Sequence, residues 1–170
     1  MPKTKGQGVV FGIIMSILME FGMGVYNTAI NAGYVSMPGG LSNMENTVFL
    51  DVLKETAYMW IVVFVVSVLV GNPLAKKLAV RIICPEKDNP FFITLMISAC
   101  TVLVMCPAMS LVATVLFSYI FQHKPVTQFF AIWFGTLLKN FPMALLWNLF
   151  AASPITRLCF RRIFKKQMTD

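Results

Sequence analysis

The chain has 170 residues, of which 58% are hydrophobic and only 12% carry a formal charge. A soluble domain carries roughly 25% charged residues, and the mean hydropathy of this chain is correspondingly high at +0.75. This composition excludes an ordinary globular enzyme, a disordered tail and a small secreted domain held together by disulfides. It indicates a small integral membrane protein.

Long stretches without a formal charge predict four membrane-spanning helices. A helix rises about 1.5 Å per residue, so roughly 20 apolar residues cross the hydrocarbon core of a bilayer. The apolar runs lack the strict alternation of a barrel strand, which favours helices. We therefore predict an all-α integral membrane protein with four transmembrane helices, at residues 9–30, 57–75, 91–120 and 129–152.

The distribution of basic residues predicts the topology. Most of the 14 Lys and Arg residues lie near the N-terminus, between the second and third spans, or in the C-terminal tail. Basic residues bias a loop toward the cytoplasm, so both termini are expected on the cytoplasmic side. The net charge of +7 therefore requires no nucleic-acid partner. The expected partner is the lipid bilayer, with anionic lipid as a further contact for the tail.

The two halves of the sequence resemble each other. Residues 72–76 (Asn-Pro-Leu-Ala-Lys) match residues 153–157 (Ser-Pro-Ile-Thr-Arg) at an offset of 81. A sparser pattern relates the first and third spans at an offset of 86: Met19, Met23 and Thr28 recur as Met105, Met109 and Thr114. An offset of 81 throughout is an alternative alignment of these two spans, which the sequence leaves open.

These matches predict a tandem duplication of a two-helix hairpin. The first repeat covers residues 1–88, and the second covers residues 89–170 with the basic cytoplasmic tail. Because each copy holds an even number of spans, the copies enter the membrane from the same side and are parallel. The alternative is that membrane helices resemble one another by composition alone, but the matched Pro and basic residues favour duplication.

The same residues carry a likeness to a known family. The segment 11–16 (Phe-Gly-Ile-Ile-Met-Ser), followed by Met19 and Met23 and then by a second helix ending in Pro-Leu-Ala-Lys-Lys, resembles domain-of-unknown-function family 2798. The resemblance implies a short bacterial protein of the inner (plasma) membrane, built from a two-helix unit that is sometimes present in tandem. It implies no activity, so no catalytic residue is carried over.

The first span has a face of small residues at steps of four. Residues at this spacing lie along one side of a helix, and small side chains let a second backbone approach closely. The pattern predicts a helix–helix contact, either within the chain, in a homo-oligomer, or with another membrane protein. The predicted packing face, which also contains Glu20, consists of Gly8, Gly12, Ser16, Gly24 and Thr28.

Two ionisable residues inside the predicted spans are candidates for a proton or substrate relay. Glu20 is near the middle of the first span, where a carboxylate usually faces the bundle interior or a wet cavity. The alternative is a neutral glutamic acid that hydrogen-bonds a neighbouring helix. Lys139 lies about eleven residues into the fourth apolar run. Its long stem favours an interfacial ammonium over a buried partner for Glu20.

No enzyme, metal or cofactor signature is evident. The sequence has no phosphate-binding loop, no zinc-protease motif and no paired carboxylates within the predicted spans. Met15, Met19 and Met23 with Cys106 are conceivable ligands for Cu(I), but flexible packing is the favoured role for these methionines. The four cysteines are expected to be small apolar fillers. We expect no catalytic residue, no metal and no cofactor.

These features point to a function class only. A charged residue in the middle of a span must face something polar, which favours a small transporter or permease-like protein. The alternative is a non-transporting accessory or regulatory subunit that binds another membrane protein through the packing face. A membrane enzyme acting on lipid is the third possibility.

Overall fold

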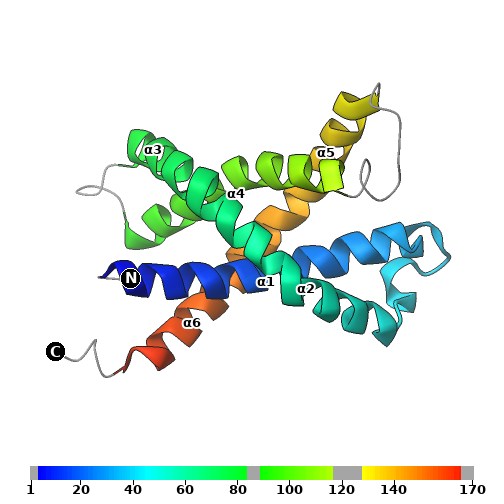
Figure 1. The fold of residues 1–170 in the computed structure, drawn as a ribbon, viewed down its shortest axis with the longest axis horizontal. Helices are drawn as coiled ribbons and strands as arrows, with labels where there is room; N and C mark the ends of the chain where they lie inside the picture. The colour runs from blue at the N-terminus through cyan, green and yellow to red at the C-terminus, as the bar shows by residue number, and fades with distance from the viewer. Residues whose placement is uncertain (1–3, 84–88, 117–127, 166–170) are drawn as a thin grey trace. The chain divides into compact units, whose positions relative to one another are not determined.

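A computed structural model describes residues 4–83, 89–116 and 128–165, and every regular element in these ranges is helical (Figure 1). The first half contains α1 (Lys5–Asn31), α2 (Asn46–Val66) and α3 (Asn72–Ile82), and the second contains α4 (Pro90–Ala113), α5 (Phe129–Trp147) and α6 (Ser153–Ile163). Two π-helical segments, η3 (Ser67–Gly71) and η6 (Asn148–Ala152), join α2 to α3 and α5 to α6.

Four helical stretches are long and apolar enough to cross a membrane, as the composition predicted. They cover Gly6–Asn31, Asn46–Ile82, Leu95–Leu116 and Phe129–Ile163. The second and fourth stretches are longer than predicted. A charged residue ends an apolar run, but it does not end the helix. The predicted end of the third span, at residue 120, lies outside the described residues.

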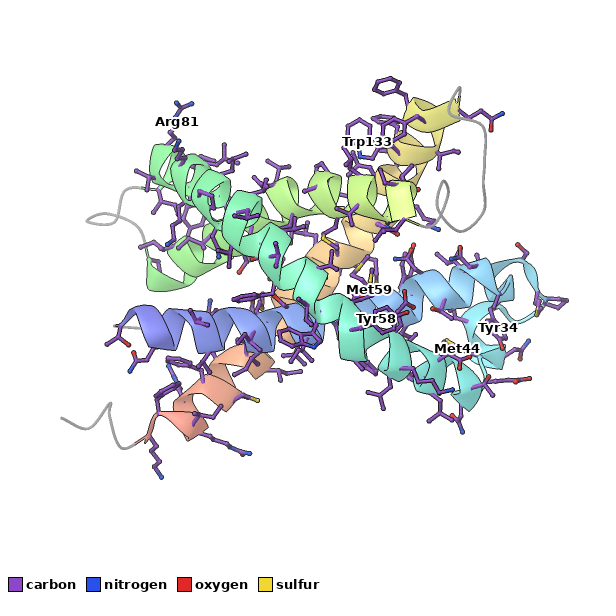
Figure 2. All side chains as sticks on the ribbon, in the orientation of Figure 1. Tyr34, Met44, Tyr58, Met59, Arg81 and Trp133 are labelled. Carbon is purple, nitrogen blue, oxygen red and sulfur yellow. The ribbon has the colours of Figure 1, made fainter. Side chains whose placement is uncertain are left out.

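The connection between α1 and α2 contains two short 3-10 turns, η1 (Tyr34–Ser36) and η2 (Gly40–Asn43). Gly39 adopts a φ of 93°, in the left-handed region that favours glycine. The Asn43 side chain donates a hydrogen bond of 2.6 Å to the carbonyl of Pro38, which closes the turn. Figure 2 labels Tyr34 and Met44 in this connection.

The described helices belong to two compact units, each formed by elements that are far apart in sequence. The first unit is Met1–Phe64 with Phe150–Asp170, and it brings α1 against α6. The rings of Phe11 and Phe160 meet edge to face, with centroids 5.7 Å apart. The hydroxyl of Thr156 donates to the sulfur of Met15 at 3.4 Å.

The second unit is Val65–Leu149, in which α4 packs against both α3 and α5. Its contact between α3 and α4 is apolar and includes Ala79, Ile83 and Cys100. On the α5 side, the indole nitrogen of Trp133 (labelled in Figure 2) donates to the carbonyl of Pro107 at 3.1 Å. Pro107 lies inside α4, where a proline disturbs the regular hydrogen bonding of a helix. The indole of Trp133 gives its carbonyl a hydrogen-bond donor from α5.

The offset of 81 recurs in the helix boundaries. The pair η3 and α3 and the pair η6 and α6 begin and end at positions related by that offset, and Pro73 and Pro154 are the second residues of α3 and α6. Within its own unit, α6 packs against α1 and α3 packs against α4. The compact units therefore combine elements of both halves, whereas the division into residues 1–88 and 89–170 stays a prediction about the sequence repeat.

Candidate functional site in the first helix pair

Two glycines bring α1 and α2 into contact. A Cβ atom added to Gly24 would lie 2.8 Å from Cγ1 of Val52, and one added to Gly12 would lie 3.1 Å from Cε2 of Phe64. Only a residue without a side chain leaves this space free, which is how small residues allow membrane helices to approach. Along α1 from Gly12 to Gly24, the contacted residue of α2 changes from Phe64 to Val52. The residue number rises on α1 by as much as it falls on α2, so the two helices run antiparallel.

This register places Thr56 of α2 opposite Glu20 of α1. Thr56 follows Val52 by one helical turn, and Glu20 precedes Gly24 by one turn. The buried residues of α2 include Val48, Val52 and Thr56, at steps of four, so one continuous face of α2 is turned inward. Glu20 therefore lies on the face of α1 that meets α2, and it is half-buried.

The other residues of the predicted packing face are placed as follows. Ser16 is buried, and Thr28 is half-buried near the end of α1, where its carbonyl accepts the Ala32 amide at 2.9 Å. No atom lies within 4 Å of a Cβ added to Gly8. The contacts made by this face through Gly12 and Gly24 are thus internal to the chain.

A second carboxylate, Glu55, lies near Glu20. Glu55 is half-buried on α2 and precedes Thr56, which lies opposite Glu20, by one residue. Glu20 is about eleven residues before the end of α1, and Glu55 is about nine residues after the start of α2. At about 1.5 Å per residue, both lie roughly 15 Å along their helices from the same connection. Two like charges therefore share one depth in the helix pair.

The hydroxyl of Thr56 completes the site. Its side chain is only 5% exposed, and its oxygen has no hydrogen-bond partner among the described residues. Three other helical threonines differ, because their hydroxyls donate to the carbonyl four residues earlier, at 2.7 to 2.8 Å: Thr101, Thr114 and Thr136. A buried polar atom without a partner is costly. We call Glu20, Glu55 and Thr56 the carboxyl site.

The sequence interpretation did not identify Glu55 or Thr56 as site residues. Glu55 precedes the second predicted span, at residues 57–75, although α2 continues on both sides of it. A usable signal was present in the four-residue spacing of Val48, Val52 and Thr56. That spacing extends the inward face of α2 well before the predicted start of the span.

The other predicted relay residue, Lys139, belongs to the second unit. It is half-buried on α5, next to Asn140, which is buried. The Oδ1 atom of Asn140 has no hydrogen-bond partner within the ranges that the structure describes. The structure therefore describes Lys139 with the second unit and the carboxyl site with the first.

The described residues do not gather the ligands of a metal centre. No group of three or more His, Cys, Asp and Glu side chains lies close enough to hold an ion within these ranges. Cys100, Cys106 and Cys159 are free thiols, while Cys84 lies outside the described residues. Met15, one of the conceivable copper ligands, accepts the hydrogen bond from Thr156 described above.

The second half of the chain repeats the packing face without its acid. The buried positions of α4 include a series at steps of four, which the offset of 86 aligns with the α1 series from Gly12 to Thr28. Burial leaves both offsets open for the first helix of each repeat, because Ser16 is buried in the α1 series while Gly12, Glu20, Gly24 and Thr28 are half-buried. The series consists of Ser98, Val102, Cys106 and Ser110 in α4 and of Thr114, which directly follows α4.

Comparison with known proteins identifies the family. The family described as "Domain of unknown function (DUF2798)" matches residues 4–83 and again residues 86–164. A Bacillus subtilis (strain 168) protein named "Uncharacterized protein YybC" is 28% identical over 169 residues, covering 99% of this chain and 98% of the relative. No solved structure matches the chain. Since the family matches twice in succession over nearly all of the sequence, the chain is a tandem member of the DUF2798 family.

Proposed function

We propose that this protein is a small membrane transporter in which the carboxyl site carries protons. The observation that supports the proposal is that Glu20 and Glu55 lie at a similar depth on two apolar helices that contact each other. A charge at the centre of a membrane helix costs about 2.5–3.5 kcal/mol on insertion scales. Since α4 builds the same face around Cys106, packing alone does not require an acid there.

In this mechanism the two carboxyl groups are never both ionised without a bound cation, because their mutual repulsion is weakly screened in an apolar surrounding. Either a proton or a cationic group compensates them. Glu20 takes up a proton from one side of the membrane and releases it to the other when a solute is exchanged. Glu55 ensures that proton release and solute binding are coupled.

The proposal is tested with purified protein in liposomes that contain a pH-sensitive dye. Alkylammonium, carboxylate and neutral sugar solutes are added in turn to the outside. The wild type is expected to show proton flux with at least one class, and Glu20→Gln is expected to lose at least about tenfold of that flux. Glu45→Gln, at an exposed residue before α2, is the matched control. Absence of flux with every class, or full flux in Glu20→Gln, would overturn the proposal.

The location proposed for this activity is the bacterial plasma membrane, with both termini in the cytoplasm. The basic residues that support this orientation include Lys76, Lys77 and Arg81 on α3, all of which are exposed. In a cysteine-free background, Thr47→Cys should react with an impermeant maleimide in intact cells, and Asn89→Cys should not. Equal labelling of the two positions would contradict the orientation.

The alternative function, an accessory subunit that binds a membrane protein through the packing face, has less support. Gly12 and Gly24 already contact Phe64 and Val52 of the same chain, so this part of the face is occupied. Co-purification of one stoichiometric membrane protein, together with the absence of flux in liposomes, would favour the alternative. We propose no enzymatic role.

A further inference from the structure

We propose that the carboxyl site binds the primary ammonium group of an organic cation. The inference deepens the proposed function, because it names the class of solute that the same site recognises. It is supported by the register that places Glu20 opposite Thr56, by the buried Thr56 hydroxyl without a partner in the described residues, and by the apolar residues next to it on α2.

The site offers acceptors that match an ammonium group. A primary ammonium has three N–H donors and no acceptor. Glu20 and Glu55 supply two carboxylates at a similar depth of the helix pair, and Thr56 supplies a hydroxyl oxygen without a partner in the described part of the chain. One ammonium group directed at these three side chains relieves the repulsion and satisfies the buried hydroxyl together. Hydrogen bonds between ionised groups are the stronger kind.

The register of the helix pair supports this convergence. Gly24 against Val52 lies one turn to one side, and the contact of Gly12 with Phe64 lies two turns to the other. Glu20 and Thr56 lie between these two contacts and on the same faces. Thr56 therefore lies on the face of α2 that meets α1, in agreement with its burial.

The surroundings favour an organic cation over a metal ion. Met59 (labelled in Figure 2), one turn beyond Glu55, is only 9% exposed, and Trp60 beside it is half-buried. Thioether and indole surfaces suit an alkyl stem. A calcium ion takes six to eight oxygen ligands, and magnesium keeps several waters, whereas this site contributes three side chains in an apolar setting.

The decisive probe pair is hexylammonium and hexyltrimethylammonium, which carry the same charge and the same chain. Binding is measured by calorimetry with the full-length protein in lipid nanodiscs. Because the trimethyl compound has no N–H donor, hexylammonium is expected to bind at least about tenfold more tightly. Equal affinity for the two probes, tighter binding of the trimethyl compound, or no binding of hexylammonium would overturn the proposal.

Three variants assign the binding to the site. Glu20→Gln and Glu55→Gln are each expected to weaken hexylammonium binding at least about tenfold, because each removes a charged acceptor. Thr56→Val keeps the shape of the side chain and removes the hydroxyl, with an expected loss of about three- to tenfold. Glu45→Gln is expected to bind as the wild type does. Helix content by circular dichroism shows which variants fold, and wild-type affinity in folded Glu55→Gln and Thr56→Val would refute the assignment.

Failure of this inference is distinguishable from failure of the proposed function. Proton flux driven by a carboxylate or a sugar, without hexylammonium binding, would retain transport and reject the ammonium site. Selective hexylammonium binding that the variants weaken, without flux, would retain the ammonium site and reject transport.

Discussion

The packing faces of α1 and α4 are built alike and carry different chemistry. Both place small side chains at steps of four, and the offset of 86 aligns them residue by residue. At the last position of the two series the residues are identical, since Thr28 corresponds to Thr114. At the centre they differ most, because Glu20 corresponds to Cys106, a thiol that is 6% exposed.

This difference indicates that the fold accepts a small side chain at the centre of the face and does not require an acid there. A thiol is sufficient for close packing at the centre of the face, so the carboxylate in α1 is an addition to a working scaffold. The partner helices differ in the same sense. At the offset of 81, Glu55 and Thr56 correspond to Thr136 and Leu137, and the Thr136 hydroxyl is satisfied by the carbonyl of Ile132. The acid and the orphaned hydroxyl therefore occur together in one repeat only.

Moving the acid from α1 to α4 tests this difference most directly. Cys106→Glu places a carboxyl in the second unit without a second acid or an orphaned hydroxyl, and we expect it to destabilise the protein by about 2.5–3.5 kcal/mol. The reverse change, Glu20→Cys, is expected to leave the protein as stable as the wild type or more so. Unfolding in detergent with increasing dodecyl sulfate measures both changes. Equal stability of Cys106→Glu and wild type would mean that either face accepts an acid.

A second change tests how closely α1 approaches α2. In Gly24→Val the new Cβ would meet Val52, so the helices must separate, and we expect a loss of about 1–3 kcal/mol. Gly135→Val on α5 is the matched control, because a Cβ added there has no atom within 4 Å. At the offset of 86, Gly24 corresponds to Ser110 of α4, which already has a Cβ atom. If both valine variants unfold at the same detergent concentration as the wild type, the α1–α2 contact is not tight.

The smallest expected effect concerns the second unit alone. Trp133→Phe removes the donor to the Pro107 carbonyl while keeping an aromatic ring, and it should cost about 0.5–1.5 kcal/mol. The same unfolding assay applies. A loss larger than that of Gly24→Val would mean that the proline carbonyl, and not the glycine contact, limits stability.

The four long apolar helical stretches followed from the sequence, because stretches of this length and composition leave a strong hydropathy signal. The repeat and the family were also predicted, from the Pro and basic residues that end the second and fourth spans. Helix ends were predicted less well, since Lys76 and Lys77 mark the limit of the apolar run and not the end of hydrogen bonding in α3. The position of Glu55 in the site was missed for the same reason.

Other features depend on contacts that no local pattern reports. The packing of α1 against α6 joins residues such as Met15 and Thr156, which are far apart in the chain. Periodicity shows that a helix has an inward face, but it does not name the helix that covers this face. The pairing of Glu20 with Thr56 likewise required the register that Gly12 and Gly24 establish against α2.

The π-helical segments η3 and η6 have a consequence for insertions and deletions. A π turn contains an extra residue relative to an α turn, so it sets the angular phase of the helix that follows. Deleting one residue within Ser67–Gly71 would turn the apolar side of α3, with Ala75 and Ala79, by about 100° around the helix axis and away from α4. The same holds for Asn148–Ala152 and α6. The length of these segments, more than their composition, decides which neighbour the following helix meets.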